Sequence, residues 1–290
     1  MESIPLCDCS SEGVLGVKRS ECGITRPKKW KEYSLSKFLT ALARLSLYAP
    51  KGRLTLAMFF LRMASRHGVT PSVYGPVFES RWPDLTFRIC VSGYNGRYLS
   101  DFLLNIGEHF SFIDIGANIG LYSLLAARNE HCVRCYAFEP NPSVFASLVH
   151  NIELNGVGHV EAIGSAVSET AGSLHFNYVD RHTGSGSVVG EGGGTAITVS
   201  SVNKDYFDRL AASDKQTKIV KIDVEGHEPV VIAELMKSDI WNSIEYLFFE
   251  CDETKYDVQE VVRRLELKGL KQIYKNAIRY PYDLMFQRFR

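Results

Sequence analysis

From about residue 110 onward, apolar and polar positions alternate in a pattern typical of βαβ units. Compact apolar runs, beginning at Phe112, are separated by longer stretches whose apolar residues recur at helical spacing. Such alternation predicts an α/β domain with a mostly parallel sheet. The expected strands lie at 111–116, 133–139, 159–166, 218–224 and 244–250, the expected helices at 119–128, 142–154, 202–211, 227–237 and 256–267, and two final strands between Leu270 and Phe289.

The first hundred residues follow a different pattern. Residues 1–32 lack periodicity and are rich in Ser, Gly, Cys and Lys, which predicts a flexible tail. Apolar residues at helical spacing predict two helices, at about 35–50 and 54–68. Short β-like runs broken by turn residues predict a hairpin at 73–99. We therefore divide the chain into a tail at 1–32, a helical and hairpin extension at 33–100 and an α/β domain at 101–290.

The charge of the chain is balanced overall but not locally. Lys plus Arg and Asp plus Glu number 33 each, so no net field gathers nucleic acid. Residues 1–70 hold twelve basic and five acidic residues, a bias that suits an anionic substrate or peripheral contact with a membrane surface, although a solvated helical face is its commoner cause. The longest apolar run, 54–63, falls short of the ~20 residues that span a bilayer, so no transmembrane segment is expected.

The cysteines and the start of the chain bear on location. Seven cysteines, an odd number, are spread over the whole length, and the first residues lack the basic and apolar regions of a secretory signal. These features predict reduced thiols and a cytoplasmic protein. Cys132 and Cys135 form a C-x-x-C pair without a second pair at zinc spacing, so we interpret them as packed thiols.

A strand that ends in an acid and two glycines is the most informative feature of the chain. The stretch 112–120 leads from apolar residues through Asp114 and Gly116 to Gly120, just before an expected helix. Glycines at such a turn let the backbone approach a ligand closely. A dinucleotide fingerprint requires glycine where Asn118 stands, so the turn suits a ligand without phosphates better than a pyrophosphate.

A second acid follows at the end of the next expected strand. Glu139 precedes Pro140, Asn141 and a helix that a proline opens well. A carboxylate at this position can accept hydrogen bonds from both ribose hydroxyls of a dinucleotide or of S-adenosylmethionine. Together with the glycine turn, this acid favours a nucleoside site over an ordinary tight turn.

Four motifs carry a resemblance to a known family. They are Asp114-Ile-Gly-Ala-Asn-Ile-Gly120, Phe138-Glu-Pro-Asn141, Ser165-Ala-Val-Ser168 and Lys221-Ile-Asp-Val-Glu-Gly-His-Glu228. Over about 180 residues the chain resembles the FkbM family of S-adenosylmethionine-dependent methyltransferases, which have a Rossmann-like α/β fold. Residues 1 to about 70 fall outside the resemblance.

The resemblance implies a cofactor, a reaction and a set of contacts. The cofactor is S-adenosylmethionine, and the methyl acceptor is a hydroxyl of a sugar, a polyketide or a related small molecule. The cofactor contacts implied are Asp114, Gly116, Asn118 and Gly120 around the methionine part, the motif of Glu139, Pro140 and Asn141 at the ribose, and Ser165, Ala166 and Val167 at the adenine.

The reacting end is expected at 221–228, where a strand leaves the carboxyl edge of the sheet. An alcohol that accepts a methyl group must lose a proton, so a base is required. Asp223 is expected to face the acceptor or the cofactor, or else to cap the following helix. His227 is a candidate base because its ordinary pKa lies nearest neutrality. Glu250, at the end of the next strand, is a candidate substrate contact or second acid.

The sequence alone leaves several alternatives open. Glu225 and Glu228 fit the first turn of the helix after Asp223, where carboxylates complement the helix dipole. Asp223, His227 and Glu250 offer ligands for magnesium, but nothing in the sequence requires a metal. A nicotinamide-dependent dehydrogenase shares the glycine turn and the second acid. A non-catalytic scaffold whose basic helices dock a partner is an alternative from another class.

Overall fold

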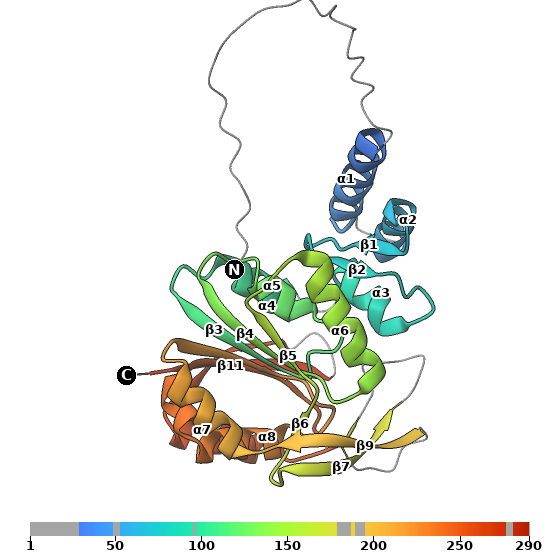
Figure 1. Ribbon diagram of the computed structural model, residues 1–290. Coiled ribbons are helices and arrows are strands. Elements are labelled where there is room, and N and C mark those ends of the chain that lie inside the picture. Colours follow the sequence, from blue (N-terminus) through green and yellow to red (C-terminus); the bar gives the residue numbers. More distant parts are fainter. Residues whose placement is uncertain are drawn as a thin grey trace, which may run out of the picture.

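A seven-stranded sheet forms the centre of the computed structural model, which describes residues 29–48, 53–94, 97–178, 187–188, 195–276 and 281–289 (Figure 1). Its strand order is β12-β13-β11-β10-β3-β4-β5. All neighbours pair in parallel except β13, which is antiparallel to both β11 and β12. The strands are β3 (Phe110–Ile115), β4 (Cys132–Phe138), β5 (Val160–Ile163), β10 (Thr217–Ile222), β11 (Ile244–Cys251), β12 (Leu270–Lys275) and β13 (Tyr282–Arg288).

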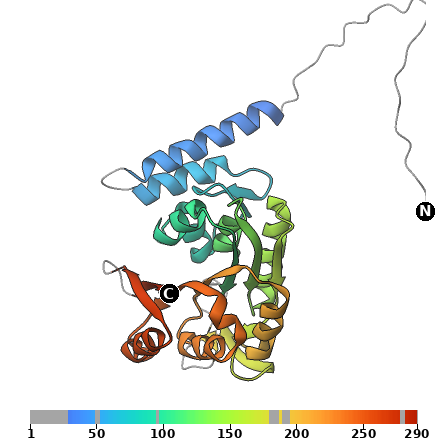
Figure 2. The same cartoon turned by 90° about the vertical axis from the view of Figure 1, so that its left-hand side faces the viewer.

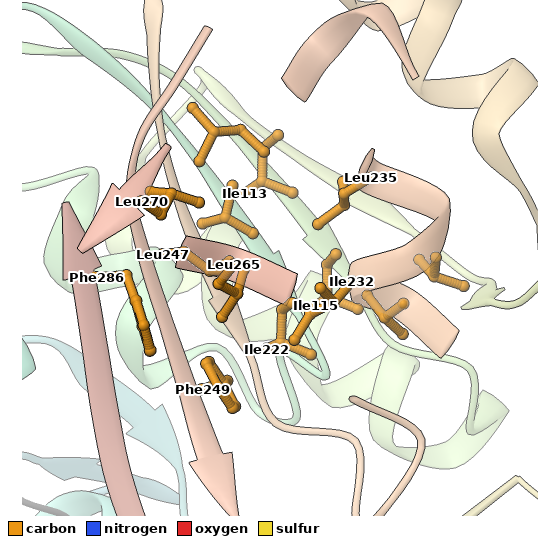
Figure 3. Close-up of a cluster of buried hydrophobic side chains, with 14 of the residues drawn as sticks. Ile113, Ile115, Ile222, Ile232, Leu235, Leu247, Phe249, Leu265, Leu270 and Phe286 are labelled. Carbon is orange, nitrogen blue, oxygen red and sulfur yellow. The ribbon is translucent and has the colours of Figure 1, made fainter. Parts of the chain in front are cut away.

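Helices cover both faces of this sheet, as Figure 1 shows. One face carries α4 (Arg97–Asn105), α5 (Leu121–Ala126) and α6 (Pro142–Asn155), and the other carries α7 (Lys204–Ser213), α8 (Glu228–Lys237), a short 3-10 helix (Asp239–Ser243) and α9 (Val258–Leu267). Every residue of β3 is buried, because the strand lies inside the sheet and helices cover both of its faces. The larger cluster packs strand residues such as Ile222 and Phe249 against Ile232 of α8 and Leu265 of α9 (Figure 3).

The strands and helices predicted for the central sheet are confirmed, with boundary differences of at most three residues. The final pair, β12 and β13, is antiparallel as a turn near Pro281 requires, although residues 277–280 lie outside the described part. The expected strand 159–166 is wrong in one respect, because it divides into β5 and a separate strand, β6 (Ala166–Val167). Cys132 and Cys135 are buried and unpaired, in agreement with packed thiols.

A second, four-stranded sheet was not predicted. Its order is β6-β9-β7-β8, and its remaining members are β7 (Gly172–Tyr178), β8 (Ser187–Val188) and β9 (Thr195–Val202). β7 and β9 pair antiparallel along seven residues, and β6 joins β9 in parallel. This small sheet extends from the end of β5 and places β6 beside the carboxyl edge of the central sheet.

The amino-terminal part of the described chain is mostly helical. Both predicted helices are present, as α1 (Lys29–Ser46) and α2 (Arg53–Ala64), and α1 starts within the segment predicted to be a tail. A short hairpin of β1 (Val69–Pro71) and β2 (Val77–Glu79) follows. Among the described helices, none combines the length and the apolar character that a membrane span requires.

The hairpin predicted at 73–99 is wrong over most of its length. The turn residue Asp84 instead caps α3 (Leu85–Ser92) by accepting a hydrogen bond from Thr86 N, and Gly93 ends that helix in a left-handed conformation with φ 77°. Phe87 and Val91 of α3 pack with Leu61 of α2 in one cluster. This packing outweighs the strand propensity of the local sequence.

Candidate active site

A cleft that holds about 830 Å³ of empty space, part of it open solvent, lies at the carboxyl ends of β3, β4 and β10. In an open α/β sheet, this edge is where ligands bind. Most of the predicted site residues line the cleft: Gly116, Asn118, Glu139, Pro140, Ser165, Ala166, Val167, Asp223 and His227. The structure therefore brings together residues that are separated by more than a hundred positions in the sequence.

Three predicted cofactor contacts lie behind the wall of the cleft instead of facing it. Asp114 is completely buried and accepts a hydrogen bond from Ser123 Oγ at 2.6 Å. Gly120 begins α5, and a Cβ there would lie 2.7 Å from a methyl of Leu148 in α6. Asn141 caps α6 by accepting from the backbone of the second helical residue. These residues hold the turns in place and do not line the cleft.

Gly116 allows two turns to touch. Its φ is 80°, a conformation that glycine adopts without strain. A Cβ at Gly116 would lie 1.9 Å from the carbonyl oxygen of Asp223, the first residue after β10. The glycine is therefore required for contact between the turns after β3 and β10. The backbone of Asp223, and not a ligand, occupies the space that a side chain at Gly116 would need.

Glu139 joins the turns after β3 and β4. Its Oε2 accepts from the backbone N–H of Asn118 at 3.0 Å, and its Oε1 accepts from that of Asn141 at 2.8 Å. Each carboxylate oxygen has a further lone pair, so Glu139 can still accept two hydroxyl donors from the cleft. Burial raises the pKa of Glu139 to about 7, although both backbone donors act in the opposite direction. The geometry fits the ribose of S-adenosylmethionine.

Lys221 is the first residue of the motif at 221–228, and the sequence alone did not indicate a role for it. Its Nζ donates to Gly116 O at 2.7 Å and forms ion pairs with Asp114 Oδ1 at 3.2 Å and Asp223 Oδ2 at 3.6 Å. The ammonium also lies 5.6 Å from the ring centroid of Tyr122. Burial alone lowers the pKa of Lys221, but the charges of Asp114 and Asp223 outweigh it and raise the pKa. Lys221 is thus a buried cation at the centre of the wall.

Three carboxylates meet beside the cleft. Oxygen atoms of Asp223, Glu225 and Glu250 lie within 4.8 Å of one another. Burial raises the pKa of Glu250 to about 9, and the negative charges of Asp223 and Glu225 add to this effect. Glu225 also forms an ion pair with Lys255 at 2.8 Å. The possible metal ligands considered from the sequence, which included His227, therefore differ from the group that the structure assembles.

His227 lines the cleft on the side of the small sheet. Its Nε2 lies 3.2 Å from Ser168 Oγ, directly after the predicted adenine contacts. Burial lowers the pKa of His227, so the imidazole is neutral at pH 7 and able to accept a proton. His227 directly precedes α8 and makes no side-chain capping bond there.

The two neighbouring acids, Glu225 and Glu228, occupy different positions relative to α8. Glu228 opens α8 and is buried, where it accepts from the backbone N–H groups of Val224 at 3.0 Å and Gly226 at 2.9 Å. The prediction that one of these acids lies in the first helical turn is confirmed by Glu228. Glu225 lies before the helix in a left-handed conformation with φ 56°, which aims it toward the carboxylate cluster.

Several residues of the cleft have no signal in the sequence motifs. Thr86 and Cys90 come from α3, Tyr122 from α5 and Phe176 from β7. Thr86 and Cys90 belong to a helix that the sequence pattern assigned to a hairpin, and Phe176 belongs to a strand that was not predicted. The hydrophobic spacing places Tyr122 in the helix predicted at 119–128, but it does not indicate that this side chain lines the cleft.

Fold and site together define a Rossmann-like nucleoside-binding protein of the methyltransferase type. The chain belongs to the FkbM family of methyltransferases, because the model of the methyltransferase FkbM domain matches residues 114–272. Its cofactor is S-adenosylmethionine. This membership replaces the dehydrogenase interpretation and supports an enzyme over a non-catalytic scaffold.

Individual relatives are distant. Methyltransferase 1 of Beauveria bassiana is 25% identical over 193 residues, which cover 59% of this chain and 76% of the relative. The hexuronic acid methyltransferase AglP of Haloferax volcanii is 32% identical over 122 residues, 41% of this chain and 47% of its own, so the match spans about half of that relative. A solved structure of TYW2 from M. jannaschii with AdoMet has 13% identity and a TM-score of 0.40, covering 78% of this chain and 89% of its own.

Proposed function

We propose that the protein transfers the methyl group of S-adenosylmethionine to a hydroxyl oxygen of a sugar, a polyketide or a related small molecule. The observation that carries this proposal is that a neutral imidazole, His227, lines the same cleft as the carboxylates of Asp223 and Glu225, with Glu250 beside those two carboxylates. A hydroxyl needs a base to remove its proton and acceptors to orient it. Both kinds of group are present.

The cofactor half of the cleft is proposed to bind S-adenosylmethionine, which supplies an electrophilic methyl group. The ribose hydroxyls donate to Glu139, and Ser165, Ala166 and Val167 form the adenine wall. Lys221 fixes the backbone of Gly116 and the carboxylate of Asp223 relative to one another. The chain thereby presents Asp223 to the reacting end in one orientation, a form of preorganisation that reduces the entropy cost of reaction.

The protonation states favour His227 as the base. A carboxyl with a pKa of about 9 keeps its proton at pH 7, so Glu250 donates a hydrogen bond and does not accept a proton. His227 has a lowered pKa and is neutral at the same pH. We therefore assign proton removal to His227, positioning of the acceptor hydroxyl to Asp223, and a hydrogen bond to a second acceptor oxygen to Glu250.

The charge of the cluster also bears on the acceptor. Asp223 and Glu225 repel a carboxylate substrate, whereas a neutral polyol offers them hydroxyl donors. The name of the archaeal relative, a hexuronic acid methyltransferase, supports a sugar acceptor. Within that class, the cluster favours neutral sugars over hexuronates.

The amino-terminal extension contributes to acceptor choice in this proposal. Thr86 and Cys90 of α3 line the cleft, and α3 packs on α2 through Phe87 and Leu61. Residues 33–100 therefore contribute Thr86 and Cys90 to the acceptor side of the cleft in this proposal, while 101–290 form the methyltransferase domain. Substrate preference would then depend on a part of the chain that precedes the family match.

The proposal is tested by incubating the protein with methyl-labelled S-adenosylmethionine and a panel of neutral sugars, hexuronic acids and polyketide alcohols. The expected product carries the label in a methyl ether, identified by mass spectrometry and by the carbon chemical shift of the methyl group. A label found only on nitrogen or carbon acceptors would overturn hydroxyl methylation. Calorimetry of cofactor binding on the same preparation separates that outcome from an inactive protein.

A further inference from the structure

Helices α1 and α2 expose an unusual amount of apolar surface. Of the thirteen large hydrophobic side chains that are exposed among the described residues, six lie on these two helices and a seventh, Tyr48, lies just after α1; the six are Leu35, Phe38, Leu45, Leu56, Phe59 and Met63. The helices lie side by side at one end of the molecule, as Figures 1 and 2 show. Contiguous exposed apolar surface of this kind marks a site of interaction.

The exposed residues form an outward face that is distinct from the face packed on the body. On α1, Leu35, Phe38 and Leu45 recur at intervals of three and seven and are exposed, with 59% of Phe38 and 66% of Leu45 accessible. Leu39 and Ala43 lie on a different side of the helix and are buried. A helix with apolar residues on both sides needs a second apolar environment in addition to the protein core.

The charge of the segment that contains α1 and α2 identifies that environment. Between Lys29 and Arg66 the sequence contains eight Lys or Arg residues and one acidic residue, Glu32. Exposed basic side chains, including Lys37 and Arg62, lie among the exposed apolar ones. Helices that combine leucine, phenylalanine and basic residues in this way lie in the interface of anionic membranes, where apolar burial and electrostatic attraction add.

Other occupants fit the charge less well. A second copy would bring together two surfaces that each carry a net charge of +7, which opposes association. Residues 1–28 of the same chain contain four acidic and four basic residues, so they offer no compensating charge. An anionic lipid surface satisfies both the apolar face and the excess of basic residues.

We propose that α1 and α2 dock the protein on an anionic membrane surface, with Phe38, Leu45 and Phe59 entering the boundary between headgroups and acyl chains. The helices lie along the surface. Because α3 lines the cleft and packs on α2, docking carries the cleft close to the membrane, where amphiphilic molecules are concentrated. The proposal does not rest on hydroxyl methylation, since vesicle binding requires neither cofactor nor acceptor.

The test is co-sedimentation of the full chain with vesicles of phosphatidylcholine alone, or with about one third phosphatidylserine. Binding is expected only to the anionic vesicles and is expected to weaken at high salt. Phe38→Gln combined with Phe59→Gln should lower the partition coefficient about tenfold or more, because two large apolar side chains no longer enter the lipid. Lys37→Glu combined with Arg66→Glu should weaken binding by a similar factor.

A matched pair of substitutions provides the control. Leu267→Gln combined with Phe289→Gln removes two equally exposed apolar side chains from the other end of the chain and should leave binding unchanged. Equal loss in both double variants would overturn the assignment to α1 and α2. Self-association of the parent without vesicles, abolished by Phe38→Gln and Phe59→Gln, would instead identify the face as a contact between copies and would also overturn the proposal.

Discussion

The ammonium of Lys221 lies 3.2 Å from the carboxylate of Asp114, and both side chains are almost completely excluded from solvent. Asp114 belongs to β3 and Lys221 to the adjacent strand β10, where the two residues are direct neighbours in register. The pair thus fixes two strands at the edge where the cleft opens. A charge in such a place is tolerated only when its partner is present.

Removal of Lys221 alone should therefore destabilise the protein strongly. Lys221→Met leaves Asp114 buried without its counter-ion, and the expected loss is about 3–5 kcal/mol in the free energy of unfolding, measured by urea denaturation. Adding Asp114→Asn to that variant should recover a large part of the loss. Arg263→Gln, which breaks the exposed pair with Glu260, should hardly change the free energy of unfolding, because solvent screens that pair. If Lys221→Met proves as mild as this control, the buried pair has no structural importance.

Binding of S-adenosylmethionine should strengthen as the pH rises through about 7. The pKa of Glu139 is raised to about 7 by burial, and the ionised carboxylate accepts stronger hydrogen bonds from ribose hydroxyls than the protonated form. Affinity should thus fall up to about tenfold per pH unit below 7 and level off above it. Calorimetry of the parent and of Glu139→Gln tests this, since the variant should bind more weakly with a flatter profile. Glu161→Gln, at an exposed site on β5, should keep the parental profile.

Turnover should depend strongly on His227. His227→Ala should lower single-turnover rates by roughly 10²- to 10⁴-fold, because the base that removes the hydroxyl proton is lost. The parental rate should rise through a pKa below the ordinary value for histidine, since burial lowers the pKa of His227. His150→Ala, an exposed position on α6, should be as active as the parent.

Asp223→Asn distinguishes the competing assignment of the base. If Asp223 were the base, this variant would lose turnover while His227→Ala retained it. Rates between pH values of about 5.5 and 9 should be measured for both variants. Full activity in His227→Ala ends the histidine hypothesis.

The protein should become less stable as the pH rises from about 4.5 to 9, because of the raised pKa of Glu250. Its folded pKa is raised to about 9, so the folded state retains a proton that the unfolded state releases near the ordinary glutamate value of 4.5. Folding is therefore opposed progressively across this window, by a few kcal/mol at its upper end. Glu250→Gln should raise the melting temperature at pH 8 but hardly change it at pH 5. Glu266→Gln, exposed on α9, should show no such pH-dependent gain.

The central sheet could be predicted because local pattern and tertiary environment agree there. Runs such as Phe110–Ile115 carry large apolar residues on both faces, and helices cover both faces. Leu85–Ser92 has a similar composition but forms α3, because Asp84 caps it and α2 covers its apolar side. Nothing in the spacing of these residues predicts which neighbour will cover them, and the small sheet around β9 was missed for the same reason.

The site was predictable to the extent that parallel strands end at one edge. This rule brings Glu139, Asp223 and Glu250 to the same edge of the sheet, as the structure confirms. The place of Glu225 depends on a left-handed backbone conformation that no periodicity reveals. Lys221 could not be recognised as a buried cation until β3 was known to lie beside β10.

The strand β13 lies between β11 and β12 although it is the last of the three to be synthesised. Until residues 282–288 have left the ribosome, β11 and β12 each present an unpaired edge, and the core lacks Leu284, Met285 and Phe286. Unpaired edges and exposed apolar surface in a nascent chain promote aggregation. A chain whose synthesis stops before residue 282 would therefore keep the residues that line the cleft but lack a completed sheet, and its exposed strand edges would make it prone to aggregation.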